Sequence, residues 1–306
     1  MTISIISHPD CALHEMGEHH PESPARLSAI QDQLLSSGLD LVLQHYDAPL
    51  VTRKQLCLVH DPEYVEYIFQ NAPEQGYFAL DPDTSMNPYT LSAAQRAAGA
   101  MVLGVDLVMT GKTSAVFCNV RPPGHHAEHN RAMGFCIFNN IAVGAAHALQ
   151  QYHLERVAIV DFDVHHGNGT EDIFRYEPRI LFCSTFQHPL YPYNNIDSGS
   201  SEIINAPLPP GADSRMFRDA VQSHWLPKLE AFMPELILVS AGFDAHIEDD
   251  MSDLRLQDRD FSWVTSQIKS VADKYAHGRI VSTLEGGYAL SALGRCVSEH
   301  IKALIG

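Results

Sequence analysis

The stretch from Arg156 to Thr170, RVAIVDFDVHHGNGT, constrains the fold of this chain more than any other. Its first part, Val157 to Val160, is a short apolar run rich in β-branched residues, which is typical of a strand buried on both faces of a parallel sheet. Two carboxylates and an imidazole follow at Asp161, Asp163 and His165, and this i, i+2, i+4 spacing places them on one side of an extended chain. Such a set at a strand end predicts a metal site, although an isolated D-x-D-x-H is equally typical of a polar turn.

Strand and helix signals alternate through the chain, which predicts a parallel sheet covered by helices on both faces. Residues 76–90 carry turn residues and little periodicity, so we expect a long surface loop there. The predicted strands are residues 3–6, 114–120, 157–160, 180–184, 236–240 and 280–283. The predicted helices run from Ser23-Pro24 to a stop at Gly38, follow Asp61-Pro62, and cover residues 92–109, 141–151, 216–232, 260–275 and 291–304.

The composition indicates one large folded domain over residues 1–306. Hydrophobic residues make up 45% of the chain and charged residues 19%, and no repeat or Pro/Ser-rich linker divides it. The net charge of −17 argues against a nucleic-acid partner, which would need a basic stripe. The same charge is compatible with a cationic substrate, or simply with an acidic surface.

The N-terminal segment lacks the basic region and long apolar stretch of a signal peptide, and no apolar run is expected to approach a membrane span. The six cysteines are scattered and never form C-x-x-C. We therefore expect reduced thiols in a cytoplasmic protein without a membrane partner. No apolar helix face exceeds what a core needs, so the sequence predicts no oligomeric state.

Unusual polar residues also follow three other predicted strands. RPPGHHAE contains the adjacent pair His125 and His126, SAGFDAH contains Asp244, and LEGGY ends in Tyr288. Each of these residues alone would more often be structural than functional. Because ligands bind beyond the carboxyl ends of parallel strands, four such ends with compatible groups favour one shared site.

The chemistry of that site follows from its residue types. Asp163, His165 and Asp244 offer hard oxygens and a borderline nitrogen, which suit zinc or iron(II) with positions left open. A histidine of the neighbouring pair can take a proton from water and return it to a leaving amine. Tyr288 can donate a hydrogen bond to an oxyanion. Together these groups predict metal-assisted hydrolysis of an amide, without identifying the acyl group.

Five ordered motifs, RPPGHHAE, GFCIFNN, VDFDVHHGNGT, SAGFDAH and LEGGY, resemble the histone deacetylase superfamily, which includes bacterial deacetylase-like amidohydrolases and acetylpolyamine amidohydrolases. The resemblance covers nearly the whole chain, from HHPESPARL at residues 19–27 onward. It implies a three-layer αβα arginase/deacetylase-like fold around a mostly parallel sheet, and a zinc-dependent deacetylase. It implies zinc ligands at Asp163, His165 and Asp244, a general base and acid at His126, its partner histidine at His125, and a carbonyl-polarising tyrosine at Tyr288.

The resemblance also implies residues that support this site. Asp161 matches a carboxylate that hydrogen-bonds the first histidine, and Asn168 stands where class II members carry an asparagine behind the second. Arg26 matches an arginine near an internal cavity by position, and Phe174 lies where an outer monovalent cation site is found in the family. An inner potassium site would use Asp161, Asp163, His165, Ser184 and Thr185.

An acyl-lysine channel is implied by the same resemblance. Phe135 matches one aromatic wall, Tyr191 is the candidate for the second wall, and Gly134 would line the floor. Polyamine-selective members carry a gatekeeper glutamate shortly after the third zinc ligand, where FDAHIEDDMSDL places Met251. Met251 favours acyl-lysine in a peptide or protein over an acetylated polyamine. A shift of one or three positions would bring one of the acidic residues 248–250 there instead.

Two other classes of protein are alternatives to a mononuclear deacetylase. A dinuclear manganese hydrolase of the arginase type would need more carboxylates than SAGFDAH supplies. A protein that binds acyl groups or metal without turnover would be expected to lack one of the catalytic groups, all of which are present.

Overall fold

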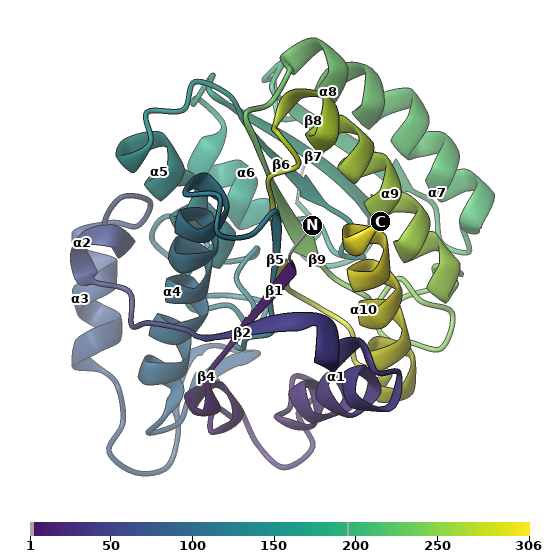
Figure 1. The fold of residues 1–306 in the computed structure, drawn as a ribbon. Helices are drawn as coiled ribbons and strands as arrows, with labels where there is room; N and C mark the ends of the chain where they lie inside the picture. Colours follow the sequence, from purple (N-terminus) through teal and green to yellow (C-terminus); the bar gives the residue numbers. More distant parts are fainter. Residues whose placement is uncertain (1–2, 195) are drawn as a thin grey trace.

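The computed structural model describes residues 3–194 and 196–306. At its centre is a sheet of eight parallel strands in the order β2-β1-β5-β10-β9-β6-β7-β8 (Figure 1). The predicted α/β architecture with a parallel sheet is confirmed. The strands are β1 (Ile3–Ser7), β2 (Leu43–Asp47), β5 (Ala115–Cys118), β6 (Val157–Asp161), β7 (Ile180–Gln187), β8 (Ile203–Leu208), β9 (Leu236–Ala241) and β10 (Ile280–Leu284).

Helices cover both faces of the sheet. Figure 1 shows α2 to α6 on one side of the sheet, and α1 with α7 to α10 on the other. The helices are α1 (Ala25–Ser36), α2 (Arg53–Leu56), α3 (Pro62–Gln70), α4 (Thr90–Met109), α5 (Asn140–Gln151), α6 (Asn168–Phe174), α7 (Ser214–Ala220), α8 (Leu226–Phe232), α9 (Asp258–Tyr275) and α10 (Leu290–Ile305).

The strand side chains alternate between two hydrophobic cores. Along β6, Val157 and Ile159 pack in the core beneath α4 and α5, whereas Ala158 and Val160 pack in the core beneath α9 and α10. Both faces of the strand are therefore buried, which explains why its sequence is continuously apolar instead of alternating.

Several parts of the chain differ from the sequence prediction, among them the short helices α2 and α6, which were not predicted. Residues 76–90 do not form only a loop, because β3 (Phe78–Asp81) and β4 (Thr84–Met86) pair as an antiparallel hairpin. The turn is held by the Asp83 N–H, which donates to Asp81 Oδ1 (3.2 Å). The two edge strands, β2 and β8, were also missed. They carry exposed or polar residues, and β8 contains Pro207, so neither shows the apolar run of a central strand.

The predicted helix over residues 216–232 is interrupted by a π-helical turn. α7 ends at Ala220, the π turn covers Val221–Trp225, and α8 continues to Phe232. Pro227 has no N–H to donate to the carbonyl four residues earlier, so the regular α-helical pattern cannot run through this point.

Helix α4 corrects the expectation that no apolar run approaches a membrane span. It has 20 residues and is apolar enough by composition to cross a membrane. Within the fold, however, 67% of its apolar window is buried, and its side chains pack in the core beside α5. Its hydrophobicity is explained by its position as a core helix.

His300, a buried histidine on α10, is expected to make the stability of the fold depend on pH. His300 Nδ1 lies 2.6 Å from Thr265 Oγ1 and Nε2 lies 2.7 Å from Ser282 Oγ, within a group of phenylalanine rings. Burial lowers the pKa of His300 to about 3. The folded protein therefore keeps this imidazole neutral at pH values where an unfolded chain would protonate it.

His300→Gln is expected to change how stability depends on pH. Below pH about 6.5 the unfolded chain protonates His300, whereas the folded protein does not. His300 therefore lowers the free energy of unfolding as pH falls from about 6.5 towards about 3, by about 1.4 kcal/mol per pH unit. Urea unfolding of wild type and variant at pH 7.5, 6 and 5 measures this directly. Wild type should lose stability relative to the variant below pH 6.5, and a constant difference would contradict a neutral His300.

Candidate active site

Three side chains with metal-ligand chemistry converge where β6 and β9 end. Asp163 and His165 follow β6, and Asp244 follows β9, its neighbour in the sheet. One ligand atom from each residue lies within 4.8 Å of the others, and all three residues are buried. His165 Nδ1 lies 3.0 Å from Asp163 Oδ1 and 3.2 Å from Asp244 Oδ2. The structure thus brings together the three residues that were predicted as zinc ligands.

Backbone N–H groups fix both carboxylates. Gly286 donates to Asp163 Oδ2 (2.7 Å) and Val164 donates to Asp244 Oδ1 (3.0 Å). Asp244 Oδ2 is buried and has no hydrogen-bond partner among the described residues. Burial and the Asp163 charge raise the pKa of Asp244 to about 6. A divalent cation would satisfy the open oxygen and offset this concentrated negative charge, so the donor set fits zinc or iron(II).

The close approach of the strand ends requires glycine at Gly286. A Cβ at this position would overlap the carboxylate groups of both Asp163 and Asp244. The glycine pair of LEGGY therefore lets the backbone reach the ligand cluster.

His125 is held as a cation beside this cluster. Its Nδ1 lies 2.9 Å from Asp161 Oδ2, and its Nε2 lies 3.8 Å from Asp163 Oδ1. Burial alone would lower the pKa of His125, but the carboxylates of Asp161 and Asp163 outweigh burial and raise it to about 10. The predicted pairing of Asp161 with His125 is present in the structure.

His126 has the opposite electrostatic state. Its Nδ1 lies 2.7 Å from Asn168 Oδ1, and the Asn168 amide is oriented by its own donation to Glu128 Oε1 (2.9 Å). The Nδ1–H therefore donates to Asn168, which leaves Nε2 unprotonated. Burial, together with the charges of His125 and His165, holds the pKa of His126 well below its usual value. A neutral imidazole with a free Nε2 is able to accept a proton.

Tyr288 reaches the same site from the end of β10. The Arg26 guanidinium lies over the Tyr288 ring, 4.9 Å from its centroid, and donates to the carbonyls of Gly287 (2.7 Å) and Glu285 (2.5 Å). Burial raises the pKa of Tyr288 well above its usual value, so the hydroxyl stays protonated and can act as a hydrogen-bond donor. Arg26 thus contacts the tyrosine and its loop.

A pocket of about 180 Å³ opens onto these groups. The Tyr191 ring stands perpendicular to that of His126, with centroids 5.1 Å apart, and the Phe135 N–H donates to Thr84 Oγ1 (2.9 Å). Gly134 has a φ of 56°, and a Cβ there would collide with the His126 ring. The lining residues are Asp83, Pro123, His125, His126, Gly134, Phe135, His165, Tyr191, Met251, Gly286 and Tyr288.

Residues of the predicted potassium site lie on adjacent strands. Asp161 on β6 is in register with Ser184 on β7. The hydroxyl oxygens of Ser184 and Thr185 are buried and have no hydrogen-bond partner among the described residues. Oxygens without partners beside a carboxylate are compatible with a monovalent cation. Phe174 packs in the hydrophobic core, and the outer cation site stays a prediction.

Two carboxylates near the pocket have roles that the sequence did not predict. Glu285 accepts hydrogen bonds from the N–H groups of Gly124 (2.7 Å) and His125 (3.1 Å), and burial raises its pKa to about 7. Asp249 accepts from the N–H of Tyr288 (2.6 Å) and of the residue after it (2.9 Å). For these two roles the sequence offers only a carboxylate inside the LEGGY motif and a run of acidic residues after Asp244.

A second group of side chains that could bind a metal lies outside the lining of this pocket. His246, Asp258 and Cys296 approach one another closely enough to share an ion. However, the Asp258 carboxylate already pairs with Arg295 (2.9 Å) and with His246 (2.9 Å). These charges are balanced without a metal, so the cluster is structural.

The fold and the site together are those of an α/β protein with a buried carboxylate–imidazole ligand set at the carboxyl edge of its parallel sheet. The sequence profile of the histone deacetylase domain matches residues 20–304. The chain belongs to the histone deacetylase family, which comprises deacetylases and related amidohydrolases.

Individual relatives agree with this assignment. The histone deacetylase-like amidohydrolase of Pseudomonas aeruginosa is 35% identical over 94% of this chain and 77% of that protein. Polyamine deacetylase HDAC10 of Mus musculus is 35% identical over the whole chain, which spans 48% of that protein's length. The crystal structure of the HDA15 HD domain superposes with a TM-score of 0.94 at 32% identity, over 100% of this chain and 88% of that one. The predicted arginase/deacetylase-like fold is thereby confirmed.

Proposed function

We propose that this protein is a zinc-dependent deacylase that removes acetyl or other acyl groups from lysine side chains of peptides or proteins. The observation that carries the proposal is the pairing of a neutral His126 with a cationic His125 beside a buried Asp-His-Asp ligand set. The narrow aromatic pocket between Phe135 and Tyr191 suits an extended, apolar lysine stem.

In the proposed mechanism, Asp163, His165 and Asp244 would hold the catalytic ion. Such an ion lowers the pKa of bound water and polarises the substrate carbonyl. His126 accepts the proton of the attacking water at Nε2 and later returns it to the leaving amine nitrogen. The positive charge of His125 favours the negative charge that develops during attack.

Tyr288 completes the proposed mechanism. Its protonated hydroxyl donates a hydrogen bond to the carbonyl oxygen as that oxygen becomes an anion, a preorganised stabilisation of the transition state. The ligand set suits iron(II) as well as zinc. One or two potassium ions, the inner one near Ser184 and Thr185, would be structural.

The decisive experiment is a turnover panel with and without a zinc chelator. An acetyl-lysine peptide is compared with acetylated putrescine, cadaverine and spermidine. Chelator-sensitive release of acetate, faster from the peptide, is expected. Preference for the polyamines would replace the proposal with an acetylpolyamine deacetylase. No turnover of any compound would point to a longer acyl group or another amide.

Met251→Glu is expected to raise activity on acetylated polyamines. Met251 lines the pocket, and its N–H donates to Asp249 Oδ1 (3.1 Å), so the substituted carboxylate would sit at the rim where a secondary ammonium passes. An added charge interaction at a partly desolvated rim predicts a gain of about tenfold in kcat/KM for acetylspermidine. Met251→Gln is the uncharged control, and equal effects of both changes would show that position 251 is not the gatekeeper.

A further inference from the structure

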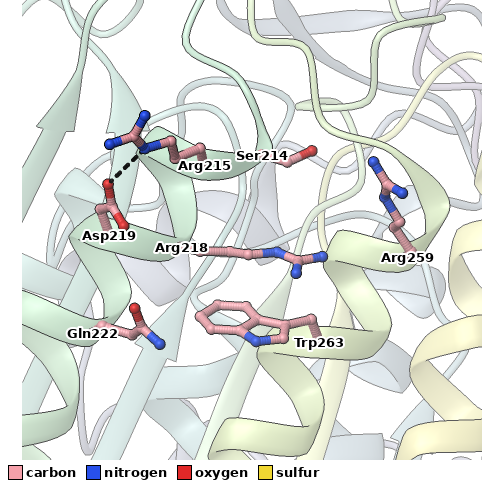
Figure 2. Close-up of a pocket in the computed structure, with 7 residues that line it drawn as sticks. All are labelled: Ser214, Arg215, Arg218, Asp219, Gln222, Arg259 and Trp263. Carbon is pink, nitrogen blue, oxygen red and sulfur yellow. Dashed lines mark ion pairs between the residues drawn. The ribbon is translucent and has the colours of Figure 1, made fainter.

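An arginine-rich hollow lies on the outer face of α7 and α9. It has a volume of about 510 Å³, and its lining includes Arg215, Arg218 and Arg259; Arg218 lies over the Trp263 ring, whereas Arg215 points toward Asp219 (Figure 2). The chain carries a net charge of −17, so clustered arginines stand out against a generally acidic protein. We call the three arginines that line this hollow, Arg215, Arg218 and Arg259, the arginine patch.

One member of the patch, Arg218, is held in place by hydrogen bonds and a ring contact. Arg218 donates twice to Asp260 Oδ1, at 3.0 Å and 2.8 Å, and lies over the Trp263 ring with its centroid 5.1 Å away (Figure 2). Asp260 is fully buried, so Arg218 is needed to balance its charge. Its role is therefore structural as well as electrostatic.

The other members have open hydrogen-bond donors. The Arg215 side chain is 88% exposed, and its ion pair with Asp219 spans 3.7 Å. Arg259 is exposed, and it makes no ion pair or side-chain hydrogen bond with the part of the chain that the structure describes. Guanidinium groups of this kind are suited to bidentate binding of carboxylates.

The patch lies on the same edge of the sheet as the catalytic pocket. α7 follows β8 and α9 follows β9, so both helices begin near the carboxyl ends of the strands. The segment after Met251 runs directly beside the start of α7, where the Gly211 N–H donates to the Asp253 carbonyl (3.1 Å). Met251 lines the pocket and precedes Arg259 by eight residues, so their Cα atoms are at most about 28 Å apart.

Charge is distributed unevenly between the pocket and the patch. Next to Met251, the exposed side chains are the acidic Glu248, Asp250 and Asp253. The hollow, in contrast, is lined by three arginines and one carboxylate, Asp219. A peptide in the pocket would meet negative charge near its acyl-lysine and positive charge several residues away.

We propose that the arginine patch docks an acidic segment of the acylated protein substrate, about five to eight residues from the modified lysine. This docking proposal rests on the proposed lysine deacylase function, and it restricts the protein substrates to those with an acidic segment near the modified lysine. Eight extended residues span about 28 Å, so a segment this far from the lysine can reach across even the largest separation that the chain allows between Met251 and Arg259. An acetylated polyamine is cationic and would gain nothing from the patch.

The test compares Arg215→Glu/Arg259→Glu with wild type on three acetyl-lysine peptides. One carries three glutamates five to eight residues before the lysine, one carries them after it, and one has glutamine in their place. Wild type should prefer one acidic peptide by about tenfold in kcat/KM, and the double variant should lose that preference while its rate on the glutamine peptide changes less than twofold. The preference should also shrink in 0.5 M salt.

The matched control is Lys112→Glu/Arg156→Glu. It makes the same change in charge at residues that precede β5 and β6, on the opposite edge of the sheet. This control should keep the preference for the acidic peptide. If both variants lose the preference equally, net charge explains the effect and docking at the patch is overturned. Docking is also overturned if wild type hydrolyses all three peptides with the same kcat/KM.

A binding measurement separates this inference from the proposed function. Fluorescence anisotropy of a labelled acidic peptide that contains no acyl-lysine reports on the patch without turnover. Weaker binding to the double variant than to the control supports docking even if no peptide is hydrolysed. Equal binding of the peptide to the double variant and the control would show that the patch is not a docking site. Displacement of the peptide by millimolar inorganic phosphate would instead show that the patch binds small anions.

Discussion

Tyr288→Phe should lower kcat by about a hundredfold or more while fold and metal content stay unchanged. Tyr288 is half-buried in the pocket lining, and desolvation there raises its pKa well above the usual value, so in the proposed mechanism its hydroxyl acts as a protonated donor. Phenylalanine keeps the ring beneath the Arg26 guanidinium and the edge contact with Phe135, whose centroid lies 6.1 Å away. The variant therefore removes one hydrogen bond to the developing oxyanion and little else.

The measurement is kcat and KM on the best peptide of the substrate panel, with zinc content determined in the same sample. Tyr64→Phe is the control, because it removes a hydroxyl that donates to the Ile137 carbonyl (2.6 Å) from a tyrosine that does not line the pocket. The control should lose stability and keep its kcat. If Tyr288→Phe retains full turnover, the oxyanion donor is a different group.

The arrangement around Tyr288 depends on contacts that no sequence pattern contains. Arg26 is fully buried, and its charge is balanced by Glu22, whose Oε1 lies 3.1 Å from Arg26 Nη1. Burial would raise the pKa of Glu22, but the guanidinium groups of Arg121 and Arg26 outweigh it and lower this pKa to about 2. A buried ionic cluster at the N-terminal side thus supports the loop that carries a residue more than 260 positions later.

The central strands and the ligand cluster could be predicted because local signals agree with the fold. β6 is continuously apolar since both of its faces are buried, and the polar residues begin where the sheet ends. The site then follows from a general property of parallel sheets, whose carboxyl ends lie at one edge.

Other elements lack such signals. β2 and β8 are edge strands with one exposed side, and the β3–β4 hairpin is short and half-exposed. Asp249 and Glu285 could not be assigned roles, because each accepts hydrogen bonds from backbone groups far away in the sequence. Backbone donors are the same at every position except proline, so the sequence contains no trace of such a partnership.

Asp244→Asn is expected to abolish metal binding and to lower kcat/KM by about a thousandfold or more, since a bound divalent ion contributes several kcal/mol to transition-state stabilisation. The asparagine oxygen can still accept from the Val164 N–H, which donates to Asp244 Oδ1 (3.0 Å), so the loop should keep its conformation. What is lost is the charge on Oδ2, the buried oxygen without a hydrogen-bond partner in the described chain.

Metal content by plasma mass spectrometry should give one zinc or iron per wild-type chain and none in the variant. Asp106→Asn is the control, because that carboxylate bonds His147 (2.7 Å) and Tyr152 (2.8 Å) at the surface of α4 and α5. It should keep both metal and activity. Two manganese ions per wild-type chain would contradict a mononuclear site, since Asp163, His165 and Asp244 supply three converging ligand atoms. Full activity of the metal-free protein would contradict metal dependence itself, because His126 alone then suffices to activate water.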